Sequence, residues 1–104
     1  MGDDFNIDSL DDIIHGRLRL GVMAYLSTAG SAEFSLLKTK LQASDGNLSV
    51  QLRKLEEAGY VTIDKAFVGK KPQTTVSLSE NGRQAYLGYL DAMRKLINDG
   101  INLA

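Results

Sequence analysis

Residues Ser44–Tyr60, with the sequence SDGNLSVQLRKLEEAGY, decide the fold of this chain. Ser44 belongs to the residue types that cap the N-terminus of a helix, and Gly59 can take the left-handed conformation that ends one. Between them, leucines recur with the i, i+4, i+7 spacing of one helical face. These are Leu48, Leu52 and Leu55. The pattern predicts an amphipathic helix over about 45–58 that docks on a core through its leucines.

The opposite side of this helix is mostly polar. It presents Asn47, Val50, Arg53, Lys54 and Glu57, with Ser49 and Gln51 on its flanks. Amide, hydroxyl and guanidinium groups are the types that reach base edges and phosphates in the major groove of DNA. An ordinary solvated helix face is the alternative, so the neighbouring elements must decide between the two.

The composition limits the classes of function. The chain has 104 residues, 43% hydrophobic and 24% charged, as expected for one globular domain. It has no cysteine and one histidine, His15, so we expect no metal site and no cofactor. The glycines are scattered and no carboxylate pair suggests a cleft, so we do not expect an enzyme. An acidic N-terminus and the lack of an apolar run of about 20 residues predict a cytoplasmic protein that does not associate with membranes.

The net charge of −1 conceals an uneven distribution. Residues 1–14 carry five aspartates and no base, whereas residues 15–90 carry ten Lys or Arg and six Asp or Glu, a net charge of +4. This asymmetry favours a nucleic-acid partner for the second segment, although it is not specific.

The N-terminal part predicts a flexible acidic tail over 1–8 and then a short helix capped by Ser9 and ending at His15. The apolar face of that helix is Leu10, Ile13 and Ile14. Gly16 interrupts the pattern, and a second helix is expected over 17–28, with Arg17 at its start.

Two short helices follow each other closely. A short extended piece at Ala32–Phe34 leads to Ser35, which we expect to cap a helix over 36–41 with Lys38 pointing outward. Gln42 and Ala43 then form a tight turn into Ser44. Two helices joined by three or four residues, the second with a polar outer face, predict a helix-turn-helix.

The hydrophobic period changes from 3.6 to 2 after Gly59. Alternating residues predict two strands within 61–78, joined by the turn Gly69-Lys70-Lys71-Pro72. A hairpin directly after a helix-turn-helix is a wing. Lys70 and Lys71 are then expected at DNA phosphates or the minor groove, or serve only to keep an exposed hairpin soluble.

The last segment predicts a long helix over about 79–98, capped by Ser79. Its apolar stripe is longer than a small core needs, which favours a C2 homodimer packed through the N- and C-terminal helices. A helix folded back on its own core is the alternative. The expected dimer interface comprises Leu10, Ile13, Ile14, Tyr86, Tyr89, Leu90, Met93, Leu96 and Ile97.

In combination, the motifs SDGNLS, LRKLEEAGYV, FVGKKP and LSENGR resemble the small stand-alone winged-helix transcriptional regulators related to the MarR and ArsR groups. The resemblance covers roughly residues 9–97. It implies a mainly α fold with a small β-hairpin, a winged helix-turn-helix with N- and C-terminal dimerisation helices. It also implies a homodimer that binds a pseudo-palindromic operator in double-stranded DNA and regulates transcription.

The DNA contacts expected from this resemblance and from the residue pattern are Arg17, Ser35, Lys38, Ser44, Asn47, Ser49, Val50, Gln51, Arg53, Lys54, Lys70 and Lys71. Val50 stands where the family often has a basic or polar residue, and it could contact a thymine methyl group. Lysines replace the arginines common in MarR-type wings, which favours phosphate contact. Two alternatives stay open: a winged helix used for protein–protein interaction, and a pocket for a small-molecule effector near Tyr86 and Tyr89.

Overall fold

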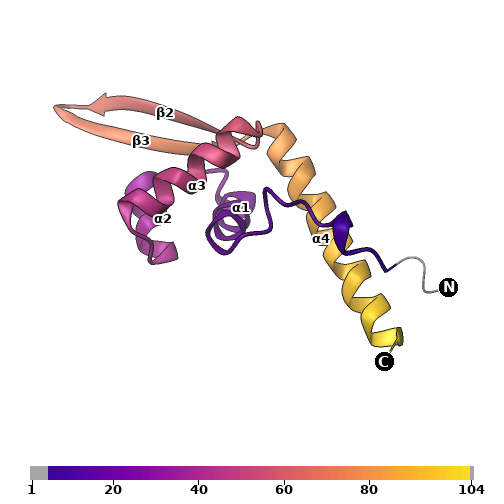
Figure 1. Cartoon of the computed structure of the whole chain (residues 1–104). Helices are drawn as coiled ribbons and strands as arrows, with labels where there is room; N and C mark the ends of the chain where they lie inside the picture. The colour runs from indigo at the N-terminus through magenta and orange to yellow at the C-terminus, as the bar shows by residue number, and fades with distance from the viewer. Residues whose placement is uncertain (1–4, 104) are drawn as a thin grey trace.

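The computed structural model describes residues 5–103, and Figure 1 shows the arrangement of its elements. The expected tail residues 1–4 lie outside the described part. The elements are η2 (Ile7–Ser9), α1 (Arg17–Ala29), β1 (Ser31–Glu33), α2 (Phe34–Leu41), α3 (Asp45–Glu57), β2 (Val61–Val68), β3 (Lys71–Leu78) and α4 (Glu80–Leu103). Four helices and one antiparallel sheet make the fold mainly helical. The pair α2–α3 followed directly by the β2–β3 hairpin confirms the expected winged helix-turn-helix.

The sheet has the strand order β1-β3-β2. β1 pairs only with Thr75–Ser77, so beyond this point the β2–β3 hairpin projects alone (Figure 1). Pro72 is therefore tolerated in β3, because at that position the strand has no neighbour on its other side within the described chain. We call the β2–β3 hairpin the wing and residues 67–72 the wing tip.

The ends of α3 follow the chemistry predicted for them. The Ser44 hydroxyl accepts a hydrogen bond of 3.1 Å from the Asn47 backbone N–H. At the other end Gly59 has φ +82°, and the Tyr60 and Gly59 N–H groups donate to the carbonyls of Leu55 and Glu56. These two hydrogen bonds together form a Schellman motif, which satisfies carbonyl groups that the helix end would otherwise leave without a partner.

One core holds the helices to the sheet. The stripe of α3 is fully buried, with Leu48 and Leu55 at 0% exposure. It packs with apolar side chains of α1, with the inner ends of the strands, and with Tyr89 of α4. Within residues 5–103 no helix has the length and apolar character needed to cross a membrane.

The N-terminal segment differs from the prediction. Residues 10–15 form no α-helix, because the Asp11 carboxylate accepts hydrogen bonds from the Ile13 and Ile14 N–H groups at 2.8 and 3.3 Å and so stabilises a turn. Residues 5–8, expected in a loose tail, lead through η2 along α4 (Figure 1).

Two other helix ends also differ. Ser35 lies inside α2 and is not its cap; Glu33 occupies the cap position without a side-chain cap bond. α4 runs to Leu103 instead of ending near 98, and Gly100 lies within the helix. A Cβ at Gly100 would lie 3.7 Å from the Phe5 ring, so the N-terminal segment packs beside this last part of α4.

The start of α4 is fixed by close contact with the end of α3. Ser79 Oγ donates to the Gly59 carbonyl at 2.6 Å and accepts from the Gly82 N–H at 2.9 Å, which confirms Ser79 as the cap. A Cβ at Gly82 would overlap the Tyr60 carbonyl oxygen. Glycine is thus required where α4 crosses this turn.

Candidate DNA-binding surface

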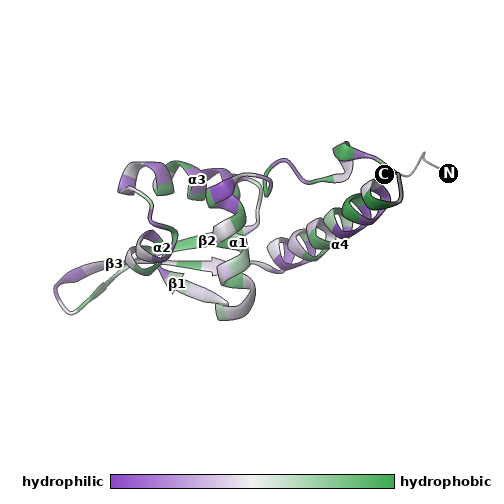
Figure 2. Ribbon diagram, turned by 90° about the horizontal axis from the view of Figure 1, so that it is seen from below, coloured by the Kyte–Doolittle hydropathy of each residue, from purple (hydrophilic) through white to green (hydrophobic). Residues whose placement is uncertain are grey.

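The exposed side of α3 carries most of the predicted contact residues. The exposed members are Ser44, Asn47, Ser49, Val50, Arg53 and Lys54. Hydrophilic and hydrophobic residues both occur along α3 in Figure 2, as expected for a helix that buries only one side. Within the part of the chain that the structure describes, no hydrogen bond or ion pair holds the Arg53 guanidinium, so it is free to contact an external partner.

Gln51 is placed differently from the other predicted contacts. It is half-buried, and its Oε1 accepts a hydrogen bond from Arg19 Nη1. Arg19 Nε also donates to the Ile13 carbonyl at 2.5 Å. Arg19 therefore ties α3 to the N-terminal segment, and we leave Gln51 out of the proposed base contacts.

Several side chains at the ends of α1, α2 and α3 carry donor groups of the kind that bind phosphates. Lys38 Nζ lies 2.9 Å from Asp45 Oδ1, an exposed ion pair between the last turn of α2 and the first turn of α3. Such exposed pairs are weak, so Lys38 can exchange Asp45 for a phosphate at little cost. The Ser44 hydroxyl accepts from Asn47 and still has its own proton to donate. Ser35, in the first turn of α2, and Arg17, at the start of α1, are also exposed.

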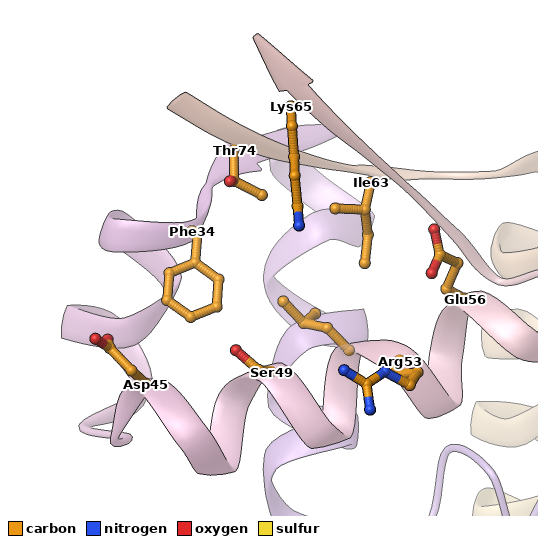
Figure 3. Close-up of a pocket in the computed structure, with 9 residues that line it drawn as sticks. Phe34, Asp45, Ser49, Arg53, Glu56, Ile63, Lys65 and Thr74 are labelled. Carbon is orange, nitrogen blue, oxygen red and sulfur yellow. The ribbon is translucent and has the colours of Figure 1, made fainter. Parts of the chain in front are cut away.

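A groove of about 630 Å³ separates α3 from the wing (Figure 3). Phe34, Leu52 and Ile63 contribute its apolar lining, and Figure 3 shows Lys65 and Thr74 reaching in from the strands opposite Ser49 on α3. The full lining is Phe34, Asp45, Ser49, Leu52, Arg53, Glu56, Ile63, Lys65 and Thr74. α3 and the wing thus form the two walls of one concave surface.

Lys65 and Thr74 line the groove but are not among the contacts that the sequence predicts. They are cross-strand partners, two positions beyond the pair Ile63 and Val76 that faces the core. Since side chains two residues apart on a strand share a face, Lys65 and Thr74 continue the core face outward into the groove. The period-2 pattern starting at Ile63 was the signal that could have found them.

The predicted wing-tip lysines are exposed and follow each other at the β2–β3 junction. The turn itself contains only Gly69, with φ +67°, and Lys70. Lys71 already belongs to β3, where it pairs with Val68. A two-residue turn that begins with glycine at positive φ suits the twist of a hairpin.

The predicted interface residues divide into three groups by exposure. Leu10, Ile14 and Tyr89 are at most 8% exposed within the single chain, so they have almost no surface left for a partner. The residues Ile13, Tyr86, Met93 and Leu96 are half-buried, whereas Leu90 and Ile97 are exposed.

Tyr89 contacts the N-terminal segment of its own chain, because its hydroxyl lies 2.7 Å from His15 Nδ1. Burial raises the pKa of Tyr89. The groove described above includes neither Tyr86 nor Tyr89.

These features define the class of protein: a helix-turn-helix with an exposed second helix, followed by a two-stranded wing, is a winged helix. Residues 18–97 match the family model described as a winged helix DNA-binding domain. The chain belongs to this family, which consists of DNA-binding domains and not of enzymes.

The chain is similar to several other proteins. An uncharacterized protein of Methanocaldococcus jannaschii is 35% identical over 78 residues, which cover 75% of this chain and 85% of that protein. The structure of a transcriptional regulator homologue from Pyrococcus horikoshii has a TM-score of 0.78 at 29% identity, covering 83% of this chain and 85% of the other. AbfR, solved bound to DNA, has a TM-score of 0.65 at 23% identity, over 72% of this chain and 54% of AbfR, which supports the fold.

Proposed function

We propose that this protein is a transcriptional regulator that binds double-stranded DNA sequence-specifically as a homodimer. In this proposal α3 enters the major groove and the wing contacts the adjacent backbone or minor groove. The observation that carries the proposal is the exposed, hydrogen-bonding face of α3 beside a groove walled by the wing. The Pyrococcus relative described as a transcriptional regulator homologue and the DNA-bound AbfR are consistent with it.

Each exposed group has a role in this arrangement. Arg53 suits bidentate contact with guanine, Asn47 suits adenine, and Val50 suits a thymine methyl group. Backbone N–H groups at helix N-termini, with Lys and Arg side chains around them, suit phosphates. The proposed phosphate contacts are Arg17, Ser35, Lys38, Ser44, Ser49, Lys54, Lys65, Lys70 and Lys71.

The proposed dimer uses α4. This helix of 24 residues projects away from the rest of the domain (Figure 1), so that the chain with α4 measures 60 × 25 × 21 Å. Exposed apolar side chains share one side of it at helical spacing. These are Leu87, Leu90, Ile97 and Ile101. Two copies related by a twofold axis would place their α3 helices in successive major grooves, about 34 Å apart.

The proposal is tested by selecting bound duplexes from a pool of random DNA and measuring the affinity of the enriched sequence by gel shift. We expect enrichment of a pseudo-palindrome with half-sites about one helical turn apart. If the folded protein enriches no sequence and shifts no duplex, it is not a DNA-binding regulator, and a role in protein–protein interaction becomes the better account. Enrichment of a single unpaired half-site would retain DNA binding but reject the dimer.

A further inference from the structure

The wing tip carries a large apolar side chain that no contact inside the chain explains. Phe67 is 74% exposed, and among residues 5–103 the core and the apolar residues packed on it do not include it. Lys70, Lys71 and Pro72 already protect the hairpin edge against pairing with other strands. A phenylalanine contributes nothing to that protection and exposes a large apolar ring to water.

The pairing register shows the direction of Phe67. Ile63, Lys65 and Phe67 alternate along β2 and so lie on one face of the wing. Their cross-strand partners are Val76, Thr74 and Pro72. This face begins in the core, passes the groove beside α3 and ends at the tip. Phe67 therefore lies on the same side of the wing as the proposed DNA-binding surface.

The two faces of the wing also differ in charge. Lys65 lies on the face of Phe67, whereas the opposite face carries both Asp64 and Lys71, whose charges cancel. Lys70, in the turn, adds a second cation near Phe67. An apolar ring flanked along the chain by two lysines matches the chemistry of a DNA minor groove, where apolar sugars and base edges lie between two rows of phosphates.

The wing is long enough to bring Phe67 to the minor groove beside the major groove that α3 would occupy. Phe67 is four residues beyond Ile63, or about 13 Å along the strand. Since Ile63 flanks α3 and the major groove is about 12 Å wide, the tip reaches past the phosphates that border this groove to the next minor groove.

We propose that Phe67 is an apolar wedge that inserts into the minor groove flanking each half-site and partly unstacks one base step. This inference rests on the proposed function. It adds a residue that would distinguish DNA sequences by how easily their base steps deform. Pyrimidine–purine steps such as TA and CA unstack most easily, so they are the steps that Phe67 would select in the flanks.

The test uses the full chain and a duplex of the enriched sequence with 2-aminopurine in the flanking step, whose fluorescence rises when the base unstacks. Phe67→Ala should weaken binding about tenfold and abolish the fluorescence rise, because an aromatic contact with a base is lost. Phe67→Leu should keep part of both signals, since leucine also serves as a wedge. Val68→Ala is the matched control: Val68 is 62% exposed at the same tip but lies on the opposite face, and its variant should behave as wild type.

Three results would overturn the inference: unchanged affinity and fluorescence in Phe67→Ala, an equal loss in Phe67→Ala and Val68→Ala, or a change of oligomeric state in Phe67→Ala as measured by sedimentation. All three are read against a wild type that binds the duplex. A wild type that binds no duplex would instead reject the proposed function.

Discussion

At the scale of single residues, Arg53 is the side chain whose replacement we expect to weaken DNA binding most. It is exposed on α3, lines the groove, and has a rigid fork of donors that fits guanine. Arg53→Ala should weaken binding to the enriched duplex by about 1–3 kcal/mol without changing the fold. Fluorescence anisotropy measures the loss, and circular dichroism checks the fold.

A control for Arg53 lies one turn further along α3. Glu57 is exposed on the same side but carries the opposite charge, so Glu57→Ala should strengthen binding slightly by removing repulsion from phosphates. If the folded Arg53→Ala protein retained full affinity, Arg53 would be removed from the proposed contacts.

Tyr60 gives a prediction of pH dependence. Its hydroxyl donates a 2.5 Å hydrogen bond to the Asp11 carboxylate, and this bond, with burial, raises the pKa of Tyr60 from 10.0 to about 12. A raised pKa means that the folded state holds the proton more tightly. The stabilisation is therefore complete below pH 10 and is lost as the pH rises from about 10 to 12.

Replacing Tyr60 by Phe should lower the free energy of unfolding by about 1–3 kcal/mol at pH 8 and by much less near pH 12. Urea unfolding at both pH values measures the difference from wild type. Tyr25→Phe serves as the control, because no hydrogen bond to its hydroxyl is found among residues 5–103. A Tyr60→Phe deficit that did not shrink at high pH would contradict the assigned role of the hydrogen bond.

At the scale of elements, the junction between α3 and α4 depends on Gly82. A Cβ there would overlap the Tyr60 carbonyl oxygen and lie 2.9 Å from Leu78 Cδ1. Gly82→Ala should lower the free energy of unfolding by roughly 2 kcal/mol or more, because α4 must shift away from the turn. Gly88→Ala, in the same helix with open space around it, should instead raise it by about 0.5–1 kcal/mol. Similar effects of the two substitutions would show that the close approach is not a constraint.

The elements that the sequence predicts well are those whose signals are local. The Ser44 cap, the Gly59 stop and the leucine stripe of α3 act within a few residues, as does the alternation of the wing. The turn at Asp11 depends on hydrogen bonds that Tyr60 donates to Asp11 and Arg19 donates to Ile13. These donors lie outside the segment 9–15, so a helix-capping pattern at Ser9 could not reveal them. For the same reason the sequence pattern predicts Gln51 as a DNA contact and could not anticipate the hydrogen bond that its Oε1 accepts from Arg19.

At the scale of the whole molecule, the proposed binding of a pseudo-palindrome depends on a second copy packing against α4. Leu90→Glu would place an unpaired charge in the proposed interface and should weaken dimerisation roughly 100-fold. Asn81→Asp is a matched control, because it adds the same charge in the exposed first turn of α4, away from the apolar side. Sedimentation velocity should show a dimer for wild type and Asn81→Asp and a monomer for Leu90→Glu. A wild-type monomer at high concentration would reject the dimer.

The salt dependence of DNA binding tests the central claim most directly, because it reports how many phosphates the surface of α3 and the wing neutralises. If each subunit of the dimer neutralises about four phosphates, the logarithm of the binding constant should fall against the logarithm of the salt concentration with a slope of roughly −7. Anisotropy titrations of the enriched duplex between low and moderate salt measure this slope. A flat response would contradict the account, because the exposed face of α3 would then not face a duplex.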